Sequence, residues 1–251
     1  MNRKKIAMLA TALMVCLCLA SCKKETPTIV GKLWQWNTTA SIFGVADQPA
    51  SVRLIASTEN TGMLFVVIED ETSPWDAAIA CPFTYTCEDD EGTLSVDISY
   101  LTDYDEDGNY STVSMPWSYD KDNNRLNLTI NGVNTFLHTE TANITLDEQP
   151  FTTVKSMKGT SWTADMSEEE GEEYIIELNF TGEKEGQLVE NYSFDGENDK
   201  ETFKLNYSYT GGLGEMTYTM WEIVSHGGFY LIDPNTLFVC DGVNLLTMKK
   251  K

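Results

Sequence analysis

The residues best suited to hold a hard cation lie in a short acidic run, 103–109, which reads Asp-Tyr-Asp-Glu-Asp-Gly-Asn. Side-chain oxygens at alternate positions around a Gly can converge on Ca²⁺. The residues at these positions are Asp103, Asp105, Asp107 and Asn109. An EF-hand loop would need Glu at its twelfth position, where this chain has Ser114. The run is therefore a partial match to a calcium site. The alternative is an acidic hairpin tip, because Asp-Gly and Gly-Asn are common in tight turns.

A second candidate site is a set of apolar and aromatic side chains in the first half of the chain. Trp75 and Ile79 are four residues apart and would share one face of a short helix. Together with Trp117 and Tyr119, they could cover an apolar pocket or stack on a sugar ring. The alternative is that these side chains plug the end of a barrel, because large apolar residues usually serve packing.

The remaining residues show no pattern typical of catalysis. His138 and His226 are the two histidines, and no Cys or His pair has zinc-site spacing. No Ser lies in a Gly-x-Ser-x-Gly elbow, and no Gly-rich loop fits a phosphate. Nothing singles out a carboxylate pair for glycoside hydrolysis among 39 acidic residues. We therefore expect a protein that is not an enzyme and has no cofactor apart from the candidate Ca²⁺.

The first 21 residues predict export. Arg3, Lys4 and Lys5 precede an apolar stretch, 6–19, which is too short to span a bilayer comfortably. The sequence Leu-Ala-Ser-Cys at 19–22 resembles the lipobox of bacterial lipoproteins. The resemblance implies that Cys22 is lipidated, so that the chain is anchored to the outer membrane and faces the periplasm or the cell surface. An ordinary secretory signal is the alternative.

Net charge indicates which partners are favoured, and cysteine content indicates whether disulfides can form. The chain has 17 Lys and Arg against 39 Asp and Glu, a net charge of −22. This charge disfavours nucleic acid and would favour cations or basic partners, although acidity also serves solubility. Beyond residue 22, three cysteines remain, an odd number for which no full disulfide framework can be drawn, and we expect buried thiols. They are Cys81, Cys87 and Cys240.

Two similar hairpin patterns predict an internal duplication. The runs 125–130 and 133–137 flank Asn131-Gly132, and the runs 236–240 and 243–246 flank Asp241-Gly242. Asn-Gly and Asp-Gly favour two-residue hairpins, since both positions must adopt positive φ. Both patterns continue as Gly-Val-Asn, which indicates the closing hairpins of two copies of one β unit.

Alternating side chains predict about eight short strands in each copy. Apolar residues at 174, 176, 178 and 180 alternate with polar ones, as do those at 203, 205, 207 and 209. The turns 59–62 and 183–186 occupy matching places in the two copies. The segment 73–81 is the one predicted helix, because Ser73 suits an N-cap, Pro74 the first helical position and Pro82 the stop.

With Gly-x-x-Trp opening each copy, at Gly31/Trp34 and Gly159/Trp162, the chain resembles the small lipocalin-like (calycin-type) β-barrel lipoproteins of Gram-negative bacteria. The resemblance implies an all-β protein with two tandem, mostly antiparallel meander barrels, and a β-sandwich is the alternative fold. The expected divisions are a signal peptide (1–21), a tether (22–29), a first domain (30–146), a linker (147–157) and a second domain (158–251). The expected function is non-catalytic binding of a small apolar ligand or a glycan. The alternative function is a structural or protein-interaction role with filled barrels.

Overall fold

The computed structural model describes residues 29–42, 45–68, 76–97, 112–131, 141–168, 171–220, 223–241 and 244–251. These residues form sixteen strands and no helix. The first eight are β1 (Leu33–Ile42), β2 (Val45–Ala56), β3 (Thr61–Ile68), β4 (Asp76–Tyr85), β5 (Glu91–Asp97), β6 (Thr112–Asp120), β7 (Arg125–Asn131) and β8 (Thr141–Gln149). The second eight are β9 (Ser161–Asp165), β10 (Glu173–Asn179), β11 (Glu185–Phe194), β12 (Glu197–Thr210), β13 (Leu213–Met220), β14 (Ile223–Asp233), β15 (Thr236–Cys240) and β16 (Asn244–Lys250).

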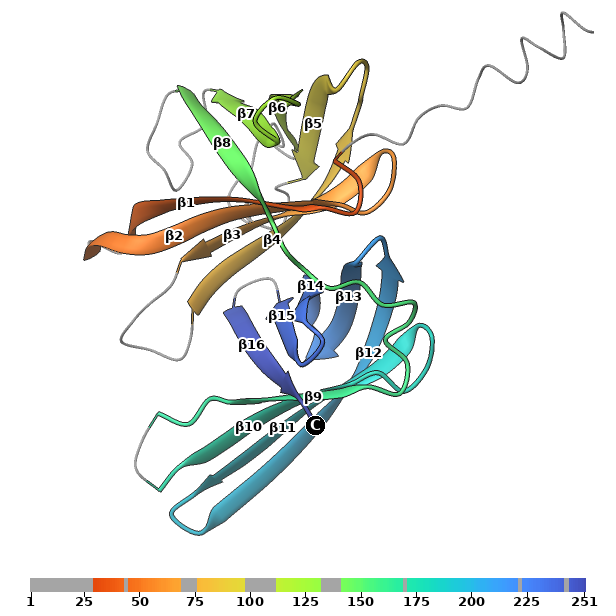
Figure 1. Cartoon of the computed structure of the whole chain (residues 1–251). Helices are drawn as coiled ribbons and strands as arrows, with labels where there is room; N and C mark the ends of the chain where they lie inside the picture. The colour runs from red at the N-terminus through yellow and green to blue at the C-terminus, as the bar shows by residue number, and fades with distance from the viewer. Residues whose placement is uncertain are drawn as a thin grey trace, which may run out of the picture.

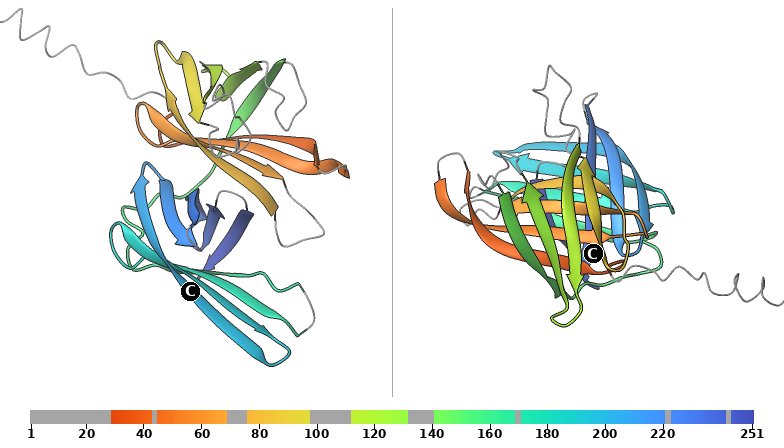
Figure 2. Two further views of the ribbon diagram at one scale, coloured as in Figure 1. Left: turned by 180° about the vertical axis from the view of Figure 1, so that it is seen from behind. Right: turned by 90° about the horizontal axis from the view of Figure 1, so that it is seen from above.

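The strands close into two antiparallel barrels in tandem (Figures 1 and 2). In the first barrel β1 pairs with β8 from Leu33 to Gln35, and in the second β9 pairs with β16 at Trp162 and Thr163. Neighbouring strands follow one another in sequence around each barrel, so both are meanders. This confirms the predicted pair of tandem eight-stranded barrels rather than the alternative β-sandwich.

The strand registers of the two barrels match position by position, which supports the internal duplication. Trp34 on β1 lies opposite Leu54, as Trp162 on β9 lies opposite Leu178. The same correspondence continues around the barrels through β6 and β7, which match β14 and β15. The central positions of β1–β8 therefore have equivalents in β9–β16, although the strand lengths differ between the copies.

In both copies a tyrosine hydroxyl hydrogen-bonds to the backbone of the turn between the second and third strands. Tyr85 Oη donates to the carbonyl of Thr58 at 2.8 Å, and Tyr207 Oη donates to the carbonyl of Gly182 at 2.7 Å. One glycine in each copy lets the strands approach there: a Cβ on Gly62 would lie 2.2 Å from a backbone oxygen, and one on Gly186 would lie 2.6 Å from one. These are the predicted matching turns, and the structure confirms their equivalence.

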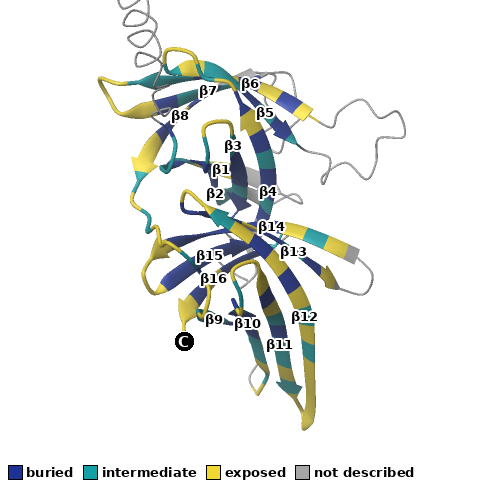
Figure 3. Ribbon diagram, turned by 90° about the vertical axis from the view of Figure 1, so that its right-hand side faces the viewer, coloured by how far each residue is buried: buried dark blue, intermediate teal, exposed yellow. Residues whose placement is uncertain are grey.

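Inward-facing side chains fill both barrels. Along β12, burial alternates from Phe203 to Tyr209 with exposed polar residues between, which confirms the predicted face (Figure 3). The first barrel's core includes Trp34, Leu94 and Leu126, all of which are fully buried. Because each copy buries one face of every strand, the two barrels have separate cores.

A third apolar cluster joins the barrels. It contains Phe65 and Ile55 from the outside of the first barrel and Tyr230 and Phe238 from the outside of the second. Arg53 Nη1 donates to Tyr230 Oη at 3.0 Å, and its guanidinium lies 4.8 Å from the centroid of Phe238. A short pairing of β16 with β4 adds backbone contacts. The barrels therefore pack on one another through buried side chains and not only through the connecting segment.

The predicted helix over 73–81 is wrong from residue 76 onward, where the chain forms β4. Ala78 and Ala80 face the cluster between the barrels, whereas Cys81 and Phe83 face the first barrel's interior. A strand with both faces buried has no polar side to reveal its period, so a short apolar run of this kind is easily taken for a helix.

Pro82 is tolerated inside β4, because its missing N–H would not have donated a hydrogen bond to β3. Tyr85 N–H donates toward β3, to the carbonyl of Asn60. Alternate residues of an antiparallel strand direct their backbone groups to opposite sides, so Pro82 faces away from β3. The recorded pairing with β5 begins only at Phe83.

The two Gly-Val-Asn segments do follow the seventh strand of each barrel, but neither forms the predicted two-residue hairpin. Ile130 lies opposite Ala142, and Cys240 lies opposite Leu245. The longer connection places Met248 opposite Leu237 in the second core, where a two-residue turn would place Leu246 there and Asn244 opposite Val239. The strand register here is set by the alternation of apolar residues that face the core, and it overrides the preference of Asp-Gly for a two-residue turn.

Cys81 and Cys240 are buried and Cys87 is half-buried, which agrees with the expected buried thiols. Burial is also the main reason that the pKa of Cys81 is raised to about 12. Among the described residues, there is no helix of sufficient length and apolarity to cross a membrane.

Candidate functional site

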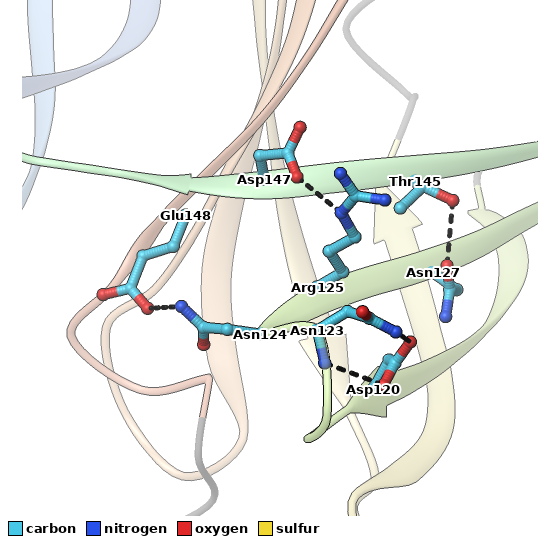
Figure 4. Close-up of polar contacts among 8 residues, drawn as sticks. All are labelled: Asp120, Asn123, Asn124, Arg125, Asn127, Thr145, Asp147 and Glu148. Atoms are coloured by element: carbon cyan, nitrogen blue, oxygen red, sulfur yellow. Dashed lines mark hydrogen bonds and ion pairs between the residues drawn. The ribbon is translucent and has the colours of Figure 1, made fainter.

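Each barrel has one end closed around the Trp of its first strand. In the first barrel, Tyr119 makes an edge contact with Trp34, at 5.8 Å between ring centroids, and Lys32 Nζ lies 5.2 Å from the Trp34 ring. Lys32 donates to Glu148 Oε2 at 2.9 Å and holds the pKa of Glu148 below its usual range. Asn124 Nδ2 donates to the same oxygen at 2.9 Å (Figure 4). This end is sealed by a polar network over an aromatic plug.

The outer face beside this end carries further cross-strand pairs (Figure 4). Arg125 Nε donates to Asp147 Oδ1 at 2.8 Å, and Thr145 Oγ1 donates to Asn127 Oδ1 at 2.9 Å. The Arg125 and Asp147 side chains are each about half exposed, so the pair contributes little to stability.

The two copies treat the Trp indole differently. Trp162 Nε1 donates to Thr160 Oγ1 at 2.9 Å. Lys32 occupies the position equivalent to Thr160, and Trp34 Nε1 is buried with no hydrogen-bond partner among the described residues. The cation over the Trp ring also comes from a different place in the second copy, where Lys250 lies 5.9 Å from Trp162. Lys250 is the equivalent of Glu148.

The structure describes three of the four predicted ligand-binding residues and places them toward opposite ends of the first barrel. Trp117 is buried in the core near the Trp34 end, and its Nε1 donates to the carbonyl of Thr86 at 3.1 Å. Tyr119 is half-buried there, and its hydroxyl donates to Asn124 Oδ1 at 2.8 Å. Ile79 lies at the other end, beside Val66 on β3. Trp75 lies outside the described residues, so the predicted grouping is not brought together by the residues described.

The ends opposite the Trp plugs, here called the mouths, differ in chemistry between the two copies. Six inward positions form a layer at each mouth, and their equivalence follows from the strand registers. In the first barrel they are Ala50, Val66, Ile79, Val96, Val113 and Ile130. In the second they are Tyr174, Glu190, Glu201, Tyr218, Ser225 and Asp241. An apolar layer in one copy is replaced by three carboxylates and three hydroxyls in the other.

Hydrogen bonds order part of this polar mouth. Tyr174 bonds to Glu190, and Tyr218 bonds to both Asp241 and Ser225. Burial, followed by the nearby charge of Glu190, raises the pKa of Tyr174 to about 12. Burial also raises the pKa of Tyr218, with a smaller contribution from Asp241.

The carboxylates of the mouth repel one another. Glu190 and Glu201 are directly opposite on β11 and β12, and Asp241 lies near enough to act on Glu190. Partial burial is the largest cause of a raised pKa at Glu190; the charges of Glu201 and Asp241 add to it, and the Tyr174 hydrogen bond opposes it. Like charges facing each other across a strand pair are destabilising, so the mouth costs stability that the first barrel's apolar layer does not.

Below the mouth there is little free space. The cavity under Glu190 and Asp241 has a volume of about 20 Å³ over a floor that includes Leu188 and Met216. That is room for roughly one water molecule. The rim carries two aromatic side chains that are more than a third exposed: Tyr192, which contacts Tyr174 edge-on at 6.1 Å, and Phe194. The site is therefore a shallow acidic surface with aromatic neighbours.

Sequence reasoning missed this mouth because its carboxylates were judged as part of the general acidity. A signal was present nonetheless. Aligning the copies through their matching turns places Glu190 on Val66. The equivalence of Glu201 and Ile79 follows only from the strand registers. That comparison identifies polar residues at positions where the fold expects apolar ones.

The other predicted sites lie outside the described residues. These are Cys22 and the proposed calcium ligands Asp103, Asp105, Asp107 and Asn109. Within the residues that the structure does describe, no group of three or more His, Cys, Asp or Glu side chains is arranged to hold a metal ion.

The comparisons with known proteins add no functional assignment. No protein-family model matches the chain, and no curated protein matches it either. Among solved structures, the chain is similar to Aeromonas veronii immune modulator A, with a TM-score of 0.36 and 12% sequence identity over 88% of this chain and 94% of that chain. A likeness at this level supports no argument about function.

Proposed function

We propose that this protein is an envelope lipoprotein, anchored through Cys22, that acts as a non-catalytic binding module. Its site is the mouth of the second barrel, formed by Glu190, Glu201 and Asp241 with Tyr174 and Tyr218. The ligand is a small polar molecule with a cationic group, such as an amine or a guanidinium. The observation that carries the proposal is the replacement of an apolar layer by carboxylates and hydroxyls at equivalent positions of the same fold.

Physical cost supports a binding role for this replacement. Turning Glu190 and Glu201 inward and opposite each other is unfavourable for folding, and nothing in the barrel's architecture requires it, because the first copy uses Val66 and Ile79. A bound cation would relieve the repulsion, and the aromatic rim at Tyr192 could stack on a guanidinium or an ammonium group. Residues that oppose folding in this way are typical of functional sites.

The core of the second barrel is filled by side chains, which leaves no room for an enclosed apolar ligand. The filled core favours, as the alternative function, a structural or protein-interaction role in which the barrels present only their surfaces. The acidic mouth supports the binding role over the structural one, because a purely structural barrel would gain stability from apolar residues there.

Calorimetric titration with arginine and with spermidine at low salt tests the proposal. Replacing Glu190 and Glu201 with Gln should weaken binding by at least about tenfold, as expected when charge-assisted hydrogen bonds are lost. The control is a variant with the same change in net charge on the first barrel, Glu59→Gln with Asp122→Asn. Equal weakening in both variants, or no binding to the unmodified chain, would refute the assigned site.

A further inference from the structure

A cleft lies between the two barrels, separate from either mouth. Its volume is about 450 Å³, within the range of roughly 300–1,000 Å³ typical of small-molecule sites. Met63, Ala80 and Pro82 of the first barrel form an apolar wall. Residues of β12, β13 and β14 form the other side, with Lys184 and Glu185 at the start of β11. Junctions between domains are a common place for ligand sites.

Sheet register orders the polar side of this cleft. Asn206 lies opposite Thr217, and Thr217 lies opposite His226, so three polar side chains form one row across three strands. Ser208 and Glu215 form the next row. Because all five lie on paired strands rather than in loops, their spacing is fixed by the sheet, as a preorganised site requires.

A glycine sets the depth of the cleft. A Cβ on Gly228, the next residue in the second row, would lie 2.2 Å from Met63 Sδ. The missing side chain therefore lets Met63 lie against the second barrel, with Phe65 close behind it. The apolar wall is brought to the end of the polar rows by this close approach.

The chemistry of the two sides suits one class of ligand. Asn206 can donate and accept hydrogen bonds, as can the hydroxyls of Thr217 and Ser208, while the Glu215 carboxylate only accepts them. A sugar ring presents hydroxyls of the same dual character at its edge and C–H groups on its faces. Pro82, which is half-buried, offers an apolar surface on which such a face could pack, and the buried Met63 lies behind it.

We propose that this inter-barrel cleft is a binding site for a neutral saccharide of one or two rings. Asn206, Thr217 and Ser208 bond its hydroxyls, and Pro82 contacts its C–H face, with Met63 buried directly behind. The site extends the proposed binding function to a second surface and does not depend on the acidic mouth.

Met63 provides a direct reporter. In the protein labelled with ¹³C at the methionine methyl groups, titration with cellobiose, lactose and N,N′-diacetylchitobiose should shift the Met63 signal saturably. The Met115 methyl, in the first barrel's core, should stay in place. The variant Thr217→Trp fills the cleft and should abolish the shift. Ser95→Trp, at the equivalent outward position of the first barrel, is the matched control and should leave it intact.

A gentler variant protects the test against misfolding. Asn206→Ala should weaken saccharide binding about tenfold, as expected for one lost hydrogen bond, whereas Thr84→Ala at the equivalent position should not. Glu190→Gln with Glu201→Gln should leave saccharide binding unchanged, which separates this site from the mouth. The proposal is overturned if none of the three disaccharides shifts Met63, or if the shift survives Thr217→Trp.

Discussion

The unpaired indole of Trp34 can be repaired by transplanting the second barrel's arrangement into the first. The substitutions are Lys32→Thr, which supplies the hydroxyl found at Thr160, and Glu148→Lys, which supplies the cation found at Lys250. In the second barrel, Thr160 Oγ1 accepts from Trp162 Nε1 and donates to the carbonyl of Met157 at 2.7 Å. Ile29 is equivalent to Met157 and, like it, is buried. We expect its carbonyl to accept from the new hydroxyl.

The magnitude follows from what is gained and lost. A buried donor without a partner costs about 1–3 kcal/mol, and the new hydroxyl removes that cost at Trp34. The Lys32–Glu148 pair is partly exposed and contributes about 0–1 kcal/mol, and the cation over the Trp34 ring is restored from position 148. The double variant should be more stable by about 1–2 kcal/mol, which corresponds to a rise in Tm of about 2–8 °C for a chain of this size.

The single variants make the reasoning testable as a cycle. Glu148→Lys alone should destabilise, because two lysines then meet at Trp34 without a carboxylate. The reverse exchange in the second barrel, Thr160→Lys with Lys250→Glu, should lower Tm by a similar amount. Thermal unfolding followed by circular dichroism measures Tm, and proton exchange at the Trp34 indole N–H should slow in the double variant. An unchanged exchange rate together with a Tm at or below that of the unmodified chain would refute the account.

Three further predictions concern other parts of the molecule. The raised pKa of Glu190 means that its carboxyl binds a proton more tightly in the folded than in the unfolded chain. Stability should therefore fall as pH rises from the ordinary Glu pKa through the raised one. In melting curves, Glu190→Gln should stabilise the protein by roughly 0.2–1 kcal/mol at pH 7.5 and have no such effect near pH 4. Gly211→Ala should destabilise by about 1–3 kcal/mol in urea unfolding, since Gly211 has φ +59° and an added Cβ would lie 2.3 Å from the Ser57 carbonyl across the barrel junction; Gly196→Ala, at a hairpin tip with open space, is its control for positive φ alone and should cost less. Cys22→Ser should move the chain from the membrane to the soluble fraction after cell lysis, and retention of the variant in the membrane would contradict the lipid anchor.

Much of the architecture could be predicted because it depends on a period-two pattern repeated in two copies. Alternation at Phe203 to Tyr209 predicts a strand with one buried face, and the structure confirms it. The same reasoning failed at residues 76–81, where the second barrel covers the outer face of β4 and removes the polar half of the pattern. Hairpin length failed for a related reason, because the register that pairs Leu237 with Met248 depends on the core of the closed barrel and not on the local dipeptide.

The candidate sites were harder to predict, since they depend on which residues of separate strands meet. The mouth of the second barrel combines β10, β11, β12, β13, β14 and the end of β15, and no local motif links them. Trp117 and Ile79 looked like partners in the sequence, yet the strand order places them at opposite ends of the barrel. Finding the mouth would have required comparing each residue of one copy with the residue at the equivalent position of the other.

The duplication also explains where a change of function is tolerated. Deep positions such as Trp34/Trp162 and Gly62/Gly186 keep their roles, because a filled barrel cannot lose a large plug or accept a Cβ against a backbone oxygen. The mouth layer borders the loops, where Val66 can become Glu190 at a cost limited by partial exposure to water. The two proposed binding sites accordingly lie at the mouth and on the outer rows that face the neighbouring barrel. A ligand at either place would meet side chains fixed by the sheet, with the two filled cores acting as the rigid support.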